Sequence, residues 1–372
     1  MSRRKISRLR ILERNRMTTM VVLRNCVSSH FPSSANKNLQ LQRPSLALKC
    51  RKRMLPLSVS IHQQPNLEYL QREFACEGVK FEEVEGNYIA KMKMRNGTRA
   101  RMMLPSGLIT SFKPHMWHGG NVEILHTIVT ENDGVPYIQG GFSPILSIEK
   151  EDGSLLTPSL WSLQSISGSP EDCIEMELQS NDEETEIRYK IHLKEDLLST
   201  EILVRDSGEA INVKGCMMTH LTLSSPEATF AIGLEGAEFK TTPLVASNFG
   251  IVPPGLGDEN WEDFEGEEDD NYKNLGDKMS RVYTSAPSFF TVMDRVSDFC
   301  FCENVSVRFR ISQGRRNSIT VAREGADELY MFSPGSRFES YGMHSFVCVA
   351  QSALLKPIVL KRGNTLRIAQ HL

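Results

Sequence analysis

Two pairs of residues in this sequence have the types and spacing that could bind a metal ion. His115 and His118 stand three apart in HMWHGG, on either side of Trp117, and Cys300 and Cys302 stand two apart in SDFCFCENV. A structural zinc ion takes four ligands, and neither pair has two more close by in the sequence. We therefore expect a surface loop at the first pair, buried free thiols at the second, and no bound metal or other cofactor.

Proton transfer is a second chemistry to consider, and His220 in MTHLTL is the residue that could carry it. An imidazole can act as a general acid or base near neutral pH, provided that it reaches the substrate and has a partner group. A single histidine on a strand is more often a hydrogen-bonded structural residue. The sequence therefore predicts a structural role for His220.

The elements that would carry these residues have a hydrophobic period of two, which is typical of strands. Short strand-like runs such as DCIEMELQ, TEIRYKIHL and ENVSVRFRIS recur about every ten residues, separated by turn sequences such as RNG, PSG and EDG. The best helix candidate is NLEYLQREFA, residues 66–75. This pattern predicts an all-β fold, a large antiparallel β-sandwich that occupies residues 68–372.

The first 67 residues differ from the rest in charge. They hold 14 of the 43 Lys and Arg residues and one of the 46 acids, which leaves 29 basic and 45 acidic residues, a formal charge of −16, in residues 68–372. Acid-poor, hydroxyl-rich sequence of this kind is typical of an organelle transit peptide. We predict a chloroplast transit peptide over residues 1–55, with residues 1–16 a possible gene-model extension. The alternative, a nucleic-acid-binding arm, fits poorly with an acidic folded part.

No apolar run in the chain approaches the roughly 18–20 residues that a membrane-spanning helix needs. The mature protein is therefore expected to be soluble or peripheral to a membrane.

An acidic segment, residues 258–270, carries nine acids in DENWEDFEGEEDD. Such a run can be a solvated loop, or it can bind a basic partner. The aromatic residues within and just after it favour a partner contact, because exposed aromatic side chains are frequent anchors in interfaces. The predicted partner-binding residues are Asp258, Trp261, Glu262, Asp263, Phe264 and Tyr272.

Several stretches resemble motifs of one family, and they occur in that family's order. They are PSGLITSFKP (105–114), IQGGFSPIL (138–146), MTHLTL (218–223), GLEG (233–236), SRVY (280–283), MFSPG (331–335) and VCVAQSALLKPIVLKRGN (347–364). These stretches resemble the galactose mutarotase-like superfamily, in particular its glucose-6-phosphate 1-epimerase and apospory-associated protein C branch. The resemblance implies a large antiparallel supersandwich with an open sugar cleft.

The departures from the family pattern fall on charged positions. His220 is retained, but Gln139, Ser280 and Ala350 stand where the family has Arg, Asp and Glu, and residues 153–161 lack the His and Arg of another motif. The family's reaction needs a carboxylate base together with an imidazolium acid, on opposite sides of one sugar. The resemblance therefore implies a pseudoenzyme without catalytic residues.

A transit peptide joined to a degenerate epimerase-like domain resembles the photosynthetic subunits of subcomplex B in the chloroplast NADH dehydrogenase-like complex. That resemblance implies a structural or assembly role in cyclic electron flow from ferredoxin to plastoquinone around photosystem I. It implies a peripheral position on the stromal side of the thylakoid, with other subunits as partners and no nucleic acid. The alternatives are a carbohydrate-binding module and an active stromal hexose-phosphate 1-epimerase with a relocated acid, Glu328 or Glu339.

Overall fold

The computed structural model describes residues 66–116, 120–132, 135–180, 185–206, 208, 210–257, 260–295, 316–338 and 342–372. Several predictions therefore lie outside the described residues: the transit peptide over 1–55, the strand-like run ENVSVRFRIS (303–312), and those made for Trp117, His118, Asp258, Cys300, Cys302 and Glu339. None of the helices in the described part is long and apolar enough to span a membrane.

The expected N-terminal helix is α2, Leu67–Phe74. It begins at Asn66, whose side-chain oxygen accepts a hydrogen bond of 2.8 Å from the backbone N–H of Tyr69 and so satisfies a free donor of the first turn. Leu70 and Phe74, four residues apart, are buried on the same face of the helix.

The first sheet has twelve strands within the described residues. Eleven follow one another in space in the order β1 (Val79–Val84), β2 (Asn87–Lys93), β3 (Arg99–Leu104), β4 (Ile109–Lys113), β7 (Phe142–Lys150), β13 (Ile211–Thr222), β22 (Phe346–Leu360), β21 (Glu328–Ser333), β18 (Met279–Tyr283), β15 (Glu238–Thr241) and β16 (Glu265–Glu267). The twelfth, β8 (Leu155–Leu156), pairs with β7.

The second sheet has nine strands within the same ranges, and a separate hairpin joins β5 (Thr127–Asn132) to β6 (Val135–Gly140). The nine strands lie in the order β17 (Tyr272–Asn274), β14 (Thr229–Ile232), β19 (Phe289–Arg295), β20 (Arg316–Glu324), β23 (Thr365–His371), β12 (Leu198–Asp206), β11 (Thr185–Leu193), β10 (Cys173–Ser180) and β9 (Trp161–Ser169). Two short 3₁₀ turns, η1 (Pro226–Ala228) and η2 (Ser336–Phe338), lie in connections.

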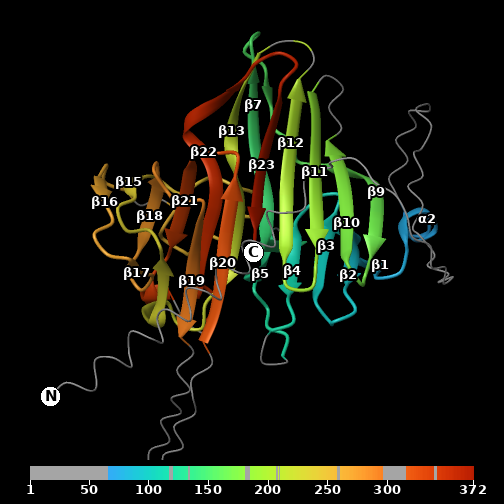
Figure 1. Cartoon of the computed structure of the whole chain (residues 1–372), viewed down its shortest axis with the longest axis horizontal. Coiled ribbons are helices and arrows are strands. Elements are labelled where there is room, and N and C mark those ends of the chain that lie inside the picture. Colours follow the sequence, from blue (N-terminus) through green and yellow to red (C-terminus); the bar gives the residue numbers. More distant parts are fainter. Residues whose placement is uncertain are drawn as a thin grey trace, which may run out of the picture. The chain divides into compact units, whose positions relative to one another are not determined.

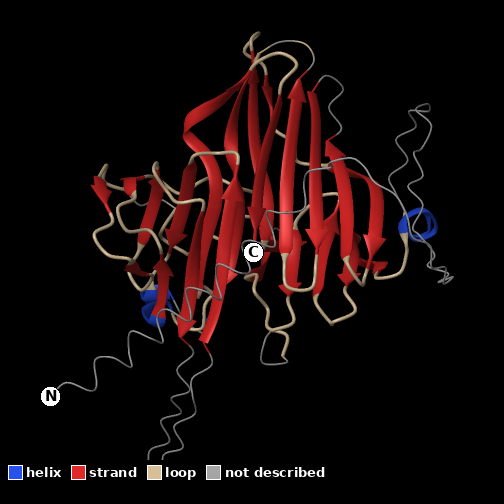
Figure 2. Ribbon diagram, in the orientation of Figure 1, coloured by secondary structure: helices blue, strands red, loops and turns tan. Residues whose placement is uncertain are grey.

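The main core forms between the two sheets. On β10 the buried and half-buried residues alternate, and Ile174, Met176 and Leu178 point into this core. Residues of the first sheet, such as Met217 and Val349, belong to the same cluster. The described strand pairs are antiparallel throughout, and Figure 2 shows how strands dominate the fold. The prediction of an all-β, large antiparallel β-sandwich is therefore confirmed.

The central strands of the first sheet are buried on both faces. On β13, every residue from Cys216 to Leu221 is buried, and on β22 the same holds from Phe346 to Ser352. Alternate residues of these strands face away from the main core and form a second hydrophobic cluster. These strands do not alternate apolar and polar residues, so their second face is not suited to water. Another part of the chain must therefore cover it.

Candidate functional site

Four neighbouring strands, β13, β22, β21 and β18, bring the candidate catalytic positions to one face of the first sheet (Figure 1). In the strand register, Ala350 lies between Met218 and Tyr330. His220 lies opposite Cys348, two residues along β22 on the same face, and Ser280 lies opposite Phe332. Of the motif positions, His220, Ser280 and Ala350 therefore share one face of this sheet, whereas Gln139 lies on β6.

The position of the missing base, Ala350, is completely buried in the second cluster. Its strand neighbours on this face are a methionine and the ring of Tyr330, whose hydroxyl lies 3.3 Å from that of Ser280. Burial raises the pKa of the Tyr330 phenol well above its usual range. Cys216, in the same cluster, has its thiol pKa raised to about 12 by burial. None of these groups is ionised near neutral pH, so none of them can serve as a base there.

His220 is buried and hydrogen-bonded through both ring nitrogens. The backbone N–H of Ile251 donates to Nε2 at 3.3 Å, so Nε2 is unprotonated and the proton is on Nδ1, which faces the carbonyl oxygen of Gly141 at 3.4 Å. Burial lowers the pKa of His220 to about 4. The ring is therefore neutral at physiological pH and is not an imidazolium that could protonate a sugar ring oxygen.

The side chain of Gln139, on β6, hydrogen-bonds to a backbone carbonyl group, so it is not available to bind an anion. Its Nε2 donates a hydrogen bond of 3.1 Å to the carbonyl oxygen of Gly250. Its Oε1 lies 3.5 Å from the hydroxyl of Thr130. An amide has no charge, so it lacks the charge-assisted hydrogen bonds with which an arginine holds a sugar phosphate.

The face is closed by residues 244–257, which we call the cover segment. Leu244, Val245, Ile251 and Leu256 of this segment pack into the second cluster. Phe249 packs against a third, smaller cluster formed by Ile89 on β2, Met103 on β3 and Leu108 in the connection that follows β3. Ile251 and Leu256 are each 2% exposed, so the cover segment is tightly packed where the resemblance predicts an open sugar cleft.

Backbone hydrogen bonds fix the middle of the cover segment. The N–H of Gly140 donates to the carbonyl oxygen of Phe249 at 2.7 Å, and the hydroxyl of Tyr137 donates to that of Asn248. Gly140 has a φ of +92°, and a Cβ there would lie 2.2 Å from a backbone oxygen and 2.8 Å from Ile251. Gly140, the first glycine of IQGG, is thus required for the chain to pass beneath the cover segment.

Glu328, proposed from the sequence as a relocated acid, is committed to the backbone. It is 6% exposed, and its Oε2 accepts hydrogen bonds from the N–H groups of Leu354 at 2.6 Å and Leu355 at 3.0 Å. Its Oε1 accepts a third, of 2.8 Å, from Lys356. A carboxylate held by three backbone donors stabilises β22 and is unavailable to a substrate.

The acidic segment is not one continuous loop. Residues Glu265–Glu267 form β16, which pairs with β15 at the edge of the first sheet. Glu268 is buried, pairs with Arg281, and accepts a hydrogen bond of 2.7 Å from the hydroxyl of Tyr283. Because these contacts are internal, deleting the whole segment would disrupt the sheet edge rather than remove only a surface feature.

The predicted anchors of the acidic segment differ in exposure. Phe264 is 58% and Tyr272 53% exposed, and Glu262 and Asp263 are exposed beside them. Trp261 is half-buried against the second cluster, with the ammonium group of Lys278 5.0 Å from its ring. Phe264 and Tyr272 are therefore the aromatic residues of this set that are open to a partner.

Two cavities lie elsewhere on the described part of the chain. One is a groove of about 540 Å³ beside β1, β2 and β3, and the other, of about 490 Å³, lies around Arg323. Among the described residues, no group of three or more His, Cys, Asp or Glu side chains could hold a metal ion. His115 is exposed, and its described surroundings offer no such group.

The cover segment is the feature that the sequence motifs did not indicate. LVASNFGIVPPGLG has neither strand nor helix periodicity, and its two prolines mark it as irregular chain. The segment is nevertheless rich in apolar residues, and this composition was the one sequence signal that could have predicted its burial.

We compared the chain with known proteins by sequence and by structure. No family model matches the chain. A protein of Arabidopsis thaliana named NDH-dependent cyclic electron flow 5 is 40% identical over 365 residues, which are 94% of this chain and 97% of that protein.

Two solved structures are similar in fold. The YeaD protein of Salmonella typhimurium, a proposed mutarotase, has a TM-score of 0.54 and 14% identity, with 79% of this chain and 92% of that chain covered. The protein HI1317 has a TM-score of 0.51 and 12% identity, with 79% and 96% covered. At these identities the likeness shows the fold alone, and the expected mutarotase-like sandwich is confirmed.

Proposed function

The chain belongs to the family of the Arabidopsis thaliana protein NDH-dependent cyclic electron flow 5, and from this membership we propose that it is a non-catalytic subunit of the chloroplast NADH dehydrogenase-like complex. Its role is structural or in assembly, in subcomplex B, and supports cyclic electron flow from ferredoxin to plastoquinone around photosystem I. The name of the relative supports the link to cyclic electron flow. The basic, acid-poor residues 1–55 support import into the chloroplast.

The observation that carries the non-catalytic part is the packed cover segment over an uncharged site. A sugar could reach Ala350 and His220 only if Ile251 and Leu256 left their buried positions. Even then it would meet a neutral imidazole, an alanine and an amide. General acid–base catalysis needs groups that can exchange protons near the working pH, and none of these residues meets that need.

The proposed contact with a neighbouring subunit is a surface that we call the acidic edge. It consists of Glu262, Asp263 and Phe264, which precede β16 at the edge of the first sheet, and Tyr272, on β17 at the edge of the second sheet. The two exposed rings supply anchors, and the acids set orientation and encounter rate against a basic partner. Asp258 belongs to the same acidic run, and Trp261 holds the run against the second cluster. The protein would then lie peripherally on the stromal side of the thylakoid membrane.

The test of this proposal is co-migration with the thylakoid complex on a native gel. Plants that lack the protein are complemented with the wild-type chain, with a Phe264→Ala, Tyr272→Ala double variant, or with a Val129→Ala, Leu160→Ala control. The control also removes two exposed apolar side chains, 68% and 54% exposed, but away from the acidic edge. We expect the wild type and the control to migrate with the complex, and the double variant to be reduced there. A wild-type protein that migrates as a free monomer would overturn the subunit proposal.

A second assay addresses the enzyme and sugar-binding alternatives. The purified protein should not accelerate anomer exchange of glucose 6-phosphate above buffer, and it should give no saturable signal when titrated with that sugar. A working general base contributes about 10²–10⁴-fold, so activity would be easily detected. Acceleration that disappears in His220→Ala would show that the site is still catalytic.

A further inference from the structure

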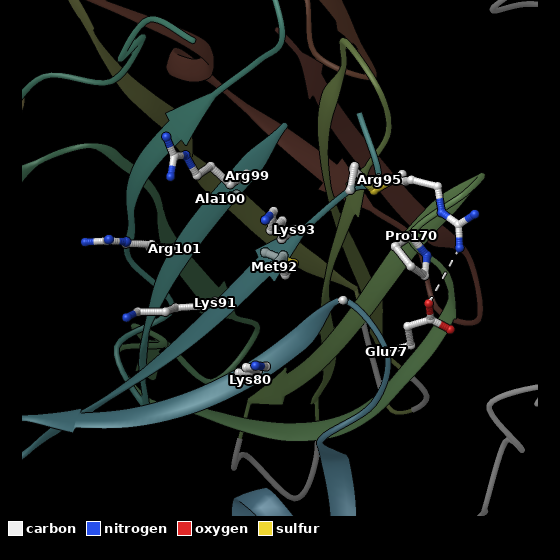
Figure 3. Close-up of a pocket in the computed structure, with 12 residues that line it drawn as sticks. Glu77, Lys80, Lys91, Met92, Lys93, Arg95, Arg99, Ala100, Arg101 and Pro170 are labelled. Carbon is white, nitrogen blue, oxygen red and sulfur yellow. Dashed lines mark ion pairs between the residues drawn. The ribbon is translucent and has the colours of Figure 1, made fainter. Parts of the chain in front are cut away.

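A group of basic side chains covers the outward face of β1, β2 and β3. We call Lys80, Lys91, Lys93, Arg99 and Arg101 the basic face. The residues between them, such as Phe81, Met92 and Met102, are buried in the main core, so the alternation of the strands directs the basic residues away from it. Figure 3 shows Lys91 and Arg101 extending from adjacent strands in the same direction.

The strand register places these like charges directly opposite one another. Lys91 lies between Lys80 on β1 and Arg101 on β3, and Lys93 lies opposite Arg99. Like charges in direct cross-strand pairs are destabilising. The arrangement therefore has a folding cost, and a binding role would offset that cost by giving the charges partners.

Few acids in the described structure neutralise this face. Lys91 pairs with Glu82, and Arg95, at the neighbouring turn, lies 2.8 Å from Glu171 and 3.9 Å from Glu77. Lys80, Lys93, Arg99 and Arg101 have no ion pair among the described residues. They stand out in a domain whose formal charge over residues 68–372 is −16, which follows from its 29 basic and 45 acidic residues.

The face is also hollowed. A groove of about 540 Å³ runs beside these strands, lined by all five residues of the basic face and by Pro170 among others (Figure 3). None of the residues that line it is a large apolar side chain exposed to solvent. A recess with a charged rim suits a narrow ligand better than a planar surface.

We propose that the basic face binds an acidic polypeptide segment of a partner protein. Alternate residues of an extended chain are about 6.6 Å apart, and so are Lys91 and Lys93, because both spacings are two residues of a strand. Alternating carboxylates can therefore meet successive cations. Each exposed pair contributes little alone, so the face chiefly guides association and sets register.

Two other polyanions fit the observations less well. An anionic membrane or a nucleic acid extends well beyond this face and would be repelled by the rest of a domain of charge −16. Stable membrane attachment also takes a second, apolar signal, and the groove lining has no exposed large apolar side chain that could insert into a bilayer. A short acidic segment can contact the basic face alone. This proposal adds a second surface to the proposed subunit role and does not depend on it.

The experiment uses the full chain, so that the basic residues 1–67 are the same in every protein compared. The face variant is Lys80→Ser, Lys93→Ser, Arg101→Ser. The control variant, Arg205→Ser, Lys214→Ser, Lys361→Ser, removes the same charges from exposed positions outside the groove. The probe is a labelled 12-residue peptide of alternating Glu and Thr, and vesicles with 30% anionic lipid and a single-stranded RNA of equal charge are titrated in parallel.

We expect the wild type and the control variant to bind the peptide with similar affinity, and the face variant to bind about tenfold more weakly at low salt. The face variant should unfold at an equal or higher temperature than the wild type, since it relieves repulsion, and this would exclude misfolding as the cause of the loss. Equal weakening in both variants would overturn the proposal. So would vesicle or RNA binding that depends on the basic face while peptide binding does not.

Discussion

Two regions lie on the same side of the first sheet, the side that faces away from the main core: the closed site beneath the cover segment, and the basic face. At the first, Ala350, Ser280 and Gln139 stand at motif positions where the resemblance predicts charged residues, and the cover segment packs over them. At the second, like charges face each other and remain open to solvent. Removing charge from a closed site favours stability, whereas keeping unpaired charge on an open sheet opposes it. The two regions therefore differ in how their charge relates to stability: the closed site has lost its cost, and the basic face has kept one.

Introducing a carboxylate at position 350 is the strongest test of the difference between the closed site and the open basic face. Ala350→Glu places a carboxylate in a fully buried, apolar position without an ion-pair partner, and its extra volume has no space. We expect a loss of about 4 kcal/mol or more in the free energy of unfolding, measured by urea denaturation, and no gain in anomer exchange.

Ala350→Met provides the control, because it adds volume without charge and should cost about 1–3 kcal/mol. A stable Ala350→Glu protein that accelerates anomer exchange would mean that the cover segment opens readily and that the cleft is intact beneath it.

The packing of the cover segment can be measured by truncating its side chains. Ile251→Ala should lower the free energy of unfolding by about 2–5 kcal/mol, since it creates a cavity in the second cluster. Val252→Ala, at the adjacent residue, is the matched control. Val252 is 46% exposed, so its truncation should change stability by less than about 0.5 kcal/mol. Similar small values for both would indicate that the segment is only loosely held.

These buried contacts mark where sequence reasoning ended. The strands, the helix at Leu67–Phe74 and the mutarotase-like motifs could be predicted because hydrophobic period and turn residues are local signals. That His220 and Ala350 share one face became visible only in the strand register. The cover segment could not be predicted, because an irregular chain has no period and its contacts with β6, β13 and β22 are all distant in sequence.

The acidic segment shows a second limit. Its composition left open a solvated loop or a partner contact, both on the surface, yet Glu268 is buried between Arg281 and Tyr283 and β16 completes a sheet edge. Charge counts do not reveal which acid has an internal partner. The basic face was missed for a related reason: its members lie on three strands, and their register became visible only in the structure.

The neutral state of His220 gives the closed site a pH signature. Its pKa in the folded protein is about 4, below the usual value of 6.5, so the unfolded chain binds the proton more tightly. Titration of His220 therefore leaves the free energy of unfolding unchanged above about pH 6.5 and lowers it progressively as pH falls toward 4, by about 3 kcal/mol in total.

The measurement is a series of urea denaturation curves between pH 7 and 4 for the wild type and His220→Gln. The variant should be less stable at pH 7 but should depend less steeply on pH across this window. Histidines with lowered pKa values that do not act on His220, such as His192 and His371, contribute equally to both proteins and cancel in the difference. Parallel curves would show that the ring of His220 is accessible to protons and hence that the cover segment is open.

The smallest expected effect concerns the repulsion on the basic face. Lys93→Thr removes one member of the cross-strand pair with Arg99 and places a good strand former in β2, so we expect a gain of a few tenths of a kcal/mol in the free energy of unfolding. Lys214→Thr is the control, an exposed lysine on β13 whose strand partner is Ser147. Because salt at 1 M screens charges beyond about 3 Å, the advantage of Lys93→Thr over the wild type should shrink at high salt, whereas the effect of Lys214→Thr should not change. If Lys93→Thr is no more stable than the wild type at low salt, the basic face has no folding cost, and its like charges need no partner to explain them.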